Sequence, residues 1–340
     1  MKARPDNARR NILPSTGIRI PVAEMESFIR DLFKSAGMSD DRATHMGVTL
    51  TANDLRCVYS HGTSQACAYV PQIREGKANP NPEVSVETES PATAVVDGDG
   101  GLGYFAAHRG TEVAIKKALE AGSATVTTRN HFHFGAAGIY SRMALPHDCI
   151  GLALSSHRYR PKPDATVMSA SGGSPMSIAI PTGDQPPLVL DMSASFLRHE
   201  DELMGMFPTV FFKALGLGSV FQVLGGILAG IWNEGFEYSG QGEYAAPHQG
   251  AFISVFDIKR FADVATFKAE MDRYIGEARA AKPIPGQDRA DLAGGVEWEW
   301  ERDNREQGVP VAPENEKRLS ELAEEMKVDA PFDRFERSRF

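Results

Sequence analysis

The sequence is poor in cysteine and in net positive charge. Its 340 residues contain only three cysteines, Cys57, Cys67 and Cys149, and none of them belongs to a CxxC pair. An odd number without that spacing argues against a disulfide framework and a zinc site, so we expect a reducing compartment and a cytoplasmic protein. The net charge of −9 excludes the basic surface on which nucleic-acid binding depends.

The N-terminus lacks the hydrophobic core of a signal peptide. Its basic run also lacks the serines and amphipathic apolar residues of a transit peptide, so we interpret it as a solvated tail. Residues 214–232 carry no charge and approach the length that spans a bilayer. Five glycines and Gln222 make this segment a poor membrane helix, and we expect a helix buried against a neighbouring subunit instead.

Apolar periodicity predicts an α/β protein. Helices are expected over 22–36, 40–54, 69–73, 104–121, 211–232, 266–281 and 315–327, and strands over 84–88, 92–96, 124–128, 150–155, 178–181, 188–190 and 251–257. The two kinds of element do not follow a regular βαβ order. We therefore predict a mixed sheet rather than a doubly wound parallel one.

The segment Gly98-x-Gly100-x-x-Gly103 matches the dinucleotide-binding fingerprint and stands between a predicted strand and a predicted helix. A Rossmann site would also need an acidic residue at the end of the next strand. Only Glu120 lies at about that distance, and it falls inside the predicted helix. We interpret the glycines as a structural turn and not as a pyrophosphate site.

Two histidines stand in glycine-containing turns and are candidates for proton transfer. His61 lies in Ser60-His61-Gly62, and His133 lies in the stretch from Arg129 to Tyr140, RNHFHFGAAGIY. Imidazoles titrate near neutrality and serve well as general acids and bases. A surface or helix-capping histidine is the alternative for His61.

His131 precedes His133 by two residues, so on a strand both side chains would point to one side. Such a pair suggests a metal, but no third histidine or carboxylate follows at a ligand spacing, and we expect no metal site. Asp191 could orient a histidine or cap a helix, and both alternatives stay open.

These motifs resemble the type 2 malate/L-lactate dehydrogenase family, which also includes ureidoglycolate and sulfolactate dehydrogenases and diketogulonate and piperideine-2-carboxylate reductases. The family pattern is Ser-His-Gly and then Arg-Asn-Ser-Asn-His-Phe-Gly-x-Ala-Gly-x-Tyr, and the resemblance runs from about Ile20 to Lys327. It implies a sulfolactate-dehydrogenase-like mixed-sheet α/β fold, not a Rossmann fold, in two lobes. Residues 1–82 with 258–340 would form a helical substrate lobe, and 83–257 a central cofactor lobe.

The resemblance also implies the roles of individual residues. By resemblance the protein would bind NAD or NADP, use a small-molecule substrate and form a homodimer with its site near the interface. The implied residues are His61, His133 and Asp191 for catalysis, Ser60, Gln65 and Tyr69 for substrate binding, and Gly172, Gly173, Ser174, Pro175 and Lys213 for cofactor binding.

The chain departs from the family pattern at both kinds of site. Gln65 stands where the family has an arginine that clamps the substrate carboxylate, so Arg56, Arg158 or Arg160 would have to replace that charge. Several cofactor loops also differ, and the stretch between Asp191 and Lys213 is shorter than in the family. Further departures are Pro163-Asp164-Ala165-Thr166 for Pro-Trp-Gly-Gly, and Ala251 for a histidine.

Three functions are consistent with these observations. The first is an NAD(P)-dependent oxidoreductase that interconverts a 2-oxo or imino acid and its 2-hydroxy or amino form. The second is a redox-neutral lyase, isomerase or hydrolase that keeps His61 and His133 but has lost nicotinamide binding. The third is a non-catalytic binding protein, which would have no need of both histidines. Resemblance over nearly the whole chain favours the first.

Overall fold

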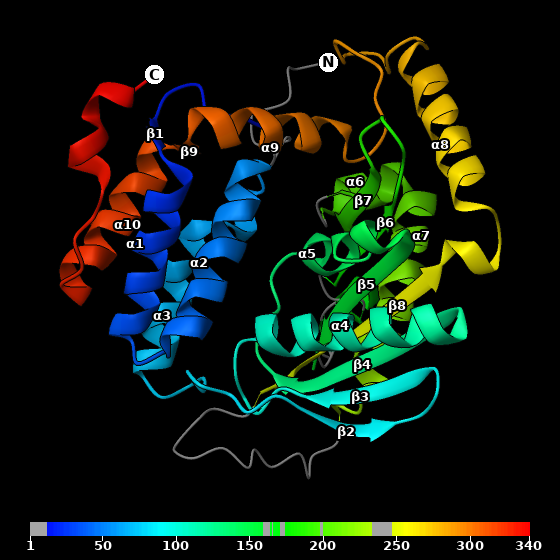
Figure 1. The fold of residues 1–340 in the computed structure, drawn as a ribbon, viewed down its shortest axis with the longest axis horizontal. Helices are drawn as coiled ribbons and strands as arrows, with labels where there is room; N and C mark the ends of the chain where they lie inside the picture. The colour runs from blue at the N-terminus through cyan, green and yellow to red at the C-terminus, as the bar shows by residue number, and fades with distance from the viewer. Residues whose placement is uncertain (1–11, 159–163, 165, 171–173, 198–199, 233–246) are drawn as a thin grey trace. The chain divides into compact units, whose positions relative to one another are not determined.

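The computed structural model describes residues 12–158, 164, 166–170, 174–197, 200–232 and 247–340. The chain divides into two compact units, which Figure 1 shows as ribbons. The first unit is formed by Met1–Asn81 together with Val296–Phe340, and the second by Pro82–Gly295.

Both ends of the chain build the core of the first unit. Strand β1 (Ile18–Ile20) pairs antiparallel with β9 (Val309–Val311). Helix α1 buries one apolar face, in which residues follow helical spacing. The helices of this unit are α1 (Val22–Ser35), α2 (Asp40–Leu55), α3 (Ala66–Arg74), α9 (Gly295–Gln307), α10 (Pro313–Met326) and the 3₁₀ segments η2 (Tyr59–His61), η3 (Thr63–Gln65) and η8 (Phe332–Ser338).

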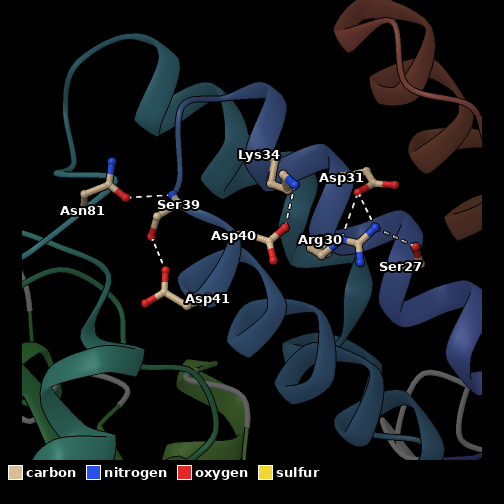
Figure 2. A network of polar contacts seen from close by, with 8 residues as sticks. All are labelled: Ser27, Arg30, Asp31, Lys34, Ser39, Asp40, Asp41 and Asn81. Carbon is tan, nitrogen blue, oxygen red and sulfur yellow. Dashed lines mark hydrogen bonds and ion pairs between the residues drawn. The ribbon is translucent and has the colours of Figure 1, made fainter.

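Polar contacts fix the junction between α1 and α2 (Figure 2). Gly37 takes a φ of 99°, which favours glycine, and ends α1. The backbone N–H of Ser39 donates to Asn81 Oδ1 at 2.7 Å, and the amide of Asn81 donates to the carbonyl of Gly37 at 2.9 Å. The ion pair between Lys34 and Asp40 is exposed and contributes little. The two hydrogen bonds of Asn81 therefore hold the end of the N-terminal part of this unit against the turn between α1 and α2.

The second unit is built on a mixed sheet of seven strands, and this confirms the predicted fold class. The strand order is β2-β3-β4-β8-β5-β6-β7, in which only β3 and β4 are parallel neighbours. The strands are β2 (Ser85–Glu89), β3 (Thr93–Asp97), β4 (Ser123–His131), β5 (Cys149–His157), β6 (Pro175–Ile180), β7 (Leu188–Ser193) and β8 (Gln249–Asp257).

Helices cover the sheet on two sides, and alternating residues separate the two cores. Ala153 and Ile253 face a core with α4 (Gly103–Ala121) and α5 (Ala137–Arg142), and Figure 1 shows α4 running beside β4. Their neighbours Leu154 and Phe252 belong to a separate cluster with Phe221 of α7 (Pro208–Gln222). The period of two along a strand explains this division. The remaining helical segments described in this unit are α6 (Asp201–Met206), α8 (Val264–Arg279), the π segment η6 (Val223–Ile227) and the 3₁₀ segments η4 (Leu145–His147), η5 (Val167–Ala170) and η7 (Ile258–Arg260).

Helix α8 belongs to the second unit, although the sequence placed the boundary at 258. The carboxylate of Asp272 on α8 accepts the backbone N–H groups of Gly183, Asp184 and Gln185 in the turn between β6 and β7. Further along the chain, the N–H of Val189 donates to the carbonyl of Ala293. These contacts are long-range in sequence and cannot be read from local patterns. They extend the unit to Gly295.

Pro208–Ile227 is the one helix, within the described ranges, that is long and apolar enough to cross a membrane. Its C-terminal part packs on the sheet. A Cβ on Gly225 would lie 3.0 Å from the backbone nitrogen of Ser156, and the hydroxyl of Ser156 donates to Gln222. Glycine thus permits a close approach to β5, as in the core helix of a globular unit.

The glycine motif is a structural turn around the end of β4. The N–H groups of Gly98, Gly100 and Gly103 donate to the carbonyls of Arg129, Asn130 and His133, respectively, and Gly101 accepts from Phe132. A Cβ on Gly98 would lie 2.8 Å from His131 Cβ, and one on Gly103 would lie 2.5 Å from His131 Nδ1. Glycine at these positions leaves space for His131 at the end of β4. The backbone N–H groups donate to backbone carbonyls and so do not form a pyrophosphate site.

His131 is fully buried in this turn, with a relative exposure of 0%. Its Nδ1 lies 2.7 Å from the carbonyl of Phe132, and its Nε2 lies 2.7 Å from Thr128 Oγ1. Because a carbonyl can only accept, Nδ1 carries the hydrogen and Nε2 accepts from the threonine. Burial, with a smaller contribution from nearby His248, lowers the pKa of His131 to about 4 against the raising effect of the hydrogen bond to Phe132. The ring is therefore neutral and structural.

Replacing His131 by alanine should destabilise the protein by about 1–3 kcal/mol, because the buried Thr128 and Phe132 groups lose their partner. The wild type should also lose stability as the pH falls from 6.5 towards 4, since the unfolded chain takes up the proton first and the folded chain does not. Urea unfolding at pH 7.5 and pH 5 measures both effects, with His108→Ala as the control, because His108 is only half-buried and lies outside this turn. Equal midpoints for the two variants at both pH values would contradict this role.

Candidate active site

In the first unit, the turn after α2 presents His61. The side-chain amide of Asn53 donates to the carbonyl of His61 at 2.8 Å. The hydroxyl of Ser60 lies 2.9 Å from Nδ1 of His61, and the imidazole itself is half-buried. One bond holds the backbone and the other orients the ring, so the position of the His61 imidazole is defined.

Gln65 also takes part in this turn. Its Nε2 donates to the carbonyl of Ser60 at 2.6 Å, so the side chain closes the turn that carries His61. Tyr69 follows on α3 and is buried. The structure thus brings Ser60 into contact with both His61 and Gln65, and it places Tyr69 one helical turn beyond Gln65.

Two of the arginines considered as replacements for a carboxylate clamp have partners within the protein. Arg56 binds Glu301 through two bonds, Nε to Oε2 at 2.7 Å and NH2 to Oε1 at 3.0 Å. Burial alone would raise the pKa of Glu301, but the charges of Arg56 and Arg305 lower it overall, which keeps the pair ionised. Nε of Arg158 donates to the carbonyl of Ile231. Arg160 lies outside the described residues.

In the second unit, His133 lies in the loop after β4 and is half-buried. Strand β4 ends at His131, and Asn130 has a φ of 56° at a break in the pairing with β8. The alternation expected for His131 and His133 therefore does not apply, because they are not on one continuous strand. His131 turns into the core, whereas His133 keeps contact with solvent.

The loop that carries His133 is held on its C-terminal side. The hydroxyl of Tyr140 donates to the carbonyl of Phe134, and the two rings lie 5.0 Å apart. Gly135 has a φ of 81°, and a Cβ there would lie 2.5 Å from the hydroxyl of Tyr104. Together with the glycine turn, these contacts fix the backbone on both sides of His133.

Asp191 on β7 accepts the backbone N–H of Gly138 at 3.0 Å, at the first turn of α5. A Cβ on Gly138 would lie 2.3 Å from Asp191 Oδ2, so glycine allows this contact. A carboxylate at a helix N-terminus is a favourable cap. This geometry agrees with the capping alternative, and it ties β7 to the segment that follows His133.

The strand register brings these residues to one end of the sheet. Gln249 at the start of β8 is the partner of His131 on one side and of His157 on the other. Pro175 at the start of β6 is the partner of Ser193 at the end of β7. Neighbouring strands lie about 4.8 Å apart. The His133 loop and the Ser174–Pro175 segment therefore emerge at the same end of the second unit.

The predicted cofactor residues are placed only in part. Ser174 is buried, and its hydroxyl has no hydrogen-bond partner among the residues that the structure describes. Lys213 is exposed on α7. Gly172 and Gly173 lie outside the described residues. A buried hydroxyl without a partner is costly, and it fits a position where a bound polar group completes the hydrogen bonding.

Sequence reasoning missed two histidines at this end of the sheet. The ring of His248 contacts the ring of Phe132 edge-on, with centroids 6.0 Å apart. Burial lowers the pKa of His157, and the nearby His248 lowers it further. One predicted strand ended at 155 and another began at 251, so His157 and His248 both fell outside the predicted strands.

No group of three or more potential metal ligands occurs among the described residues.

Comparison with known proteins identifies the relatives of this chain. The family model described as malate/L-lactate dehydrogenase matches residues 20–201 and 196–320. A malate dehydrogenase from Pyrococcus horikoshii is 27% identical over 92% of this chain and 96% of its own length. An L-sulfolactate dehydrogenase from Methanocaldococcus jannaschii is 35% identical over 51% of this chain and 50% of its own length.

The fold agrees with these relationships. The solved structure of the Pyrococcus horikoshii malate dehydrogenase superposes with a TM-score of 0.81 at 26% identity, and the match covers 94% of this chain and 98% of that one. These relatives are named dehydrogenases, and a further one from Escherichia coli K12, 23% identical over 79% of this chain and 85% of its own length, is named ureidoglycolate dehydrogenase (NAD(+)). The chain belongs to the malate/L-lactate dehydrogenase family and is a nicotinamide-dependent dehydrogenase.

Proposed function

We propose that this oxidoreductase interconverts a 2-oxo or imino acid and its 2-hydroxy or amino form, with His61 and His133 as its acid/base residues. One observation carries this proposal. Each compact unit presents a half-buried histidine on a turn whose backbone is fixed by hydrogen bonds. A scaffold protein has no reason to fix two solvent-accessible imidazoles in this way.

The proposed chemistry divides the work between cofactor and protein. The bound nicotinamide supplies or accepts the hydride at C2. The protein moves the proton at the C2 oxygen or nitrogen, and an imidazole suits this because its ordinary pKa lies near neutrality. The bond between Ser60 Oγ and His61 Nδ1 fixes the orientation of the imidazole ring in this turn.

Substrate binding is proposed for Ser60, Gln65 and Tyr69. Gln65 has a neutral amide, and this amide donates to the carbonyl of Ser60. A neutral residue in this position holds a carboxylate less strongly than an arginine does. We therefore expect a substrate whose binding depends less on a charged residue at its carboxylate. We also expect the KM of the wild type to be higher than that of Gln65→Arg.

For the cofactor, NAD or NADP, we propose contacts with Gly172, Gly173, Ser174, Pro175 and Lys213. The buried, unpartnered hydroxyl of Ser174 at the end of the sheet supports this assignment. The exposed ammonium of Lys213 is suited to a phosphate group. Asp191 is proposed to act through the backbone, since its carboxylate holds the first turn of α5 behind His133.

We also propose a cytoplasmic homodimer. The thiols of Cys57, Cys67 and Cys149 are all free, as in a reducing compartment. A face of apolar side chains on α7 and η6 is exposed, and such faces mark protein interfaces. Its exposed members are Phe212, Val220, Val223 and Ile227.

Substituting either histidine tests the acid/base assignment. His61→Asn and His133→Asn should each lower kcat by roughly 100-fold or more, because general acid/base catalysis contributes about 10²- to 10⁴-fold. Cofactor binding should be unchanged. Steady-state assays with NADH, NADPH and a panel of 2-oxo and imino acids measure this, with His108→Asn on the exposed face of α4 as the control. Near-normal kcat in both variants would refute the assignment.

Charge on the apolar face tests the dimer. Phe212→Glu and Ile227→Glu should convert a dimer to a monomer, because a buried carboxylate at an interface is strongly unfavourable. Sedimentation velocity measures the mass of each species. Phe261→Glu is the matched control, since Phe261 is 73% exposed and lies outside this face. Dimers in all three variants, or a monomeric wild type, would reject this interface.

A further inference from the structure

Asp54 lies behind the turn that carries His61, at the C-terminal end of α2. The residue is 3% exposed. Its Oδ2 accepts two hydrogen bonds from Thr63, one from the backbone N–H at 3.1 Å and one from the hydroxyl at 2.5 Å. Its Oδ1 is buried and has no hydrogen-bond partner among the described residues. A buried carboxylate with one unpaired oxygen is expensive, so its presence calls for a role.

The carboxyl group of Asp54 fills the space beneath Gly62. A Cβ on Gly62 would lie only 1.6 Å from Asp54 Oδ1, so no other residue fits there without displacing the carboxyl. Asp54 therefore holds the backbone directly after His61, and the neighbouring Asn53 holds the carbonyl of His61 itself. Two consecutive residues of α2 thus hold the two peptide groups that follow His61, namely His61–Gly62 and Gly62–Thr63.

We propose that Asp54 is a positioning residue for His61: its buried carboxyl holds the Gly62–Thr63 peptide and so fixes where the imidazole lies. The contact with Thr63 is made by two donors from one residue, which restrains both the position and the direction of the peptide. A restraint of this kind matters for catalysis, because displacement of a catalytic group by about 1 Å can cost 10²-fold in rate.

The protonation of Asp54 gives this role a recognisable signature. Burial raises the pKa of Asp54 to about 7, against the lowering effect of the two bonds from Thr63. The titratable groups beside it are Cys57 and Tyr59, and burial raises the pKa of both, so they stay neutral near pH 7. Arg19 on β1 is the charged group that faces those two. The Asp54 charge thus changes in the neutral range, whereas Cys57 and Tyr59 stay neutral there.

The test compares three near-isosteric variants. Asp54→Asn removes the charge, and Thr63→Val removes the hydroxyl donor. Thr51→Val is the matched control, because Thr51 lies on the same helix and its buried hydroxyl has no partner among the described residues. The measurements are kcat and KM between pH 5.5 and 9, and the chemical shift of the His61 Cε1–H signal over the same range.

This proposal rests on the proposed function, in which His61 transfers a proton, but the His61 signal does not require turnover. We expect kcat to fall roughly 10- to 100-fold in Asp54→Asn and less in Thr63→Val, with the KM of NADH or NADPH unchanged and Thr51→Val within about twofold of wild type. In the wild type the His61 signal should show a second inflection near pH 7, and this inflection should be absent from Asp54→Asn.

A wild-type kcat and an unchanged His61 signal in Asp54→Asn at every pH would overturn the positioning role. A wild type without turnover on any oxo or imino acid would count against the proposed function alone. In that case the His61 signal still decides: loss of its second inflection in Asp54→Asn supports the positioning role, and an identical titration in both proteins rejects it.

Discussion

The hydrogen bonds between residues 98–103 and the end of β4 are the constraint on which the second unit depends. They join a turn between β3 and α4 to the strand that delivers His133, and the pairing of β3 with β4 lies directly beside them. His131 fills the space that the glycines leave, and its neutral ring satisfies Thr128 and Phe132. A buried group that must remain neutral and bonded restricts the local backbone to one arrangement.

A comparable arrangement occurs in the first unit, with different chemistry. There a carboxyl beneath Gly62 holds the N–H of Thr63, and the amide of Asn53 donates to the carbonyl of His61. In both units a glycine gives a buried polar group access to the backbone beside a half-buried histidine. The glycines are thus explained by close approach, which is a different requirement from the phosphate binding that the pattern around 98–103 otherwise suggests.

Local patterns predicted much of the fold. The apolar faces of α1 and α4 and the alternation in β5 and β8 gave elements that the structure contains, with boundaries shifted by a few residues. Helix α9 was missed because seven of its thirteen residues are charged. Its buried contact is polar instead: Asn304 donates to the carbonyl of Leu55 and accepts from Arg19. No hydrophobic periodicity marks such a helix.

The candidate site could be predicted by residue type but not by environment. Both glycine-containing turns were recognisable, and so was the resemblance that gave them roles. The sequence did not show that Gln65 binds its own turn, that Arg56 is paired with Glu301, or that Asp54 is buried under Gly62. Each of these depends on a contact whose partner a local pattern cannot identify, and for Arg56 that partner lies far away in the chain.

The most direct test of the account is a calorimetric titration of the purified protein with NADH and NADPH, in the wild type and in Lys213→Ala. The account predicts saturable binding of at least one of them, on the order of micromolar Kd, which corresponds to about −8 kcal/mol. It also predicts weaker binding in the Lys213 variant, since an ammonium near a phosphate is lost. Absence of heat for both nucleotides up to millimolar concentration would contradict a nicotinamide-dependent dehydrogenase.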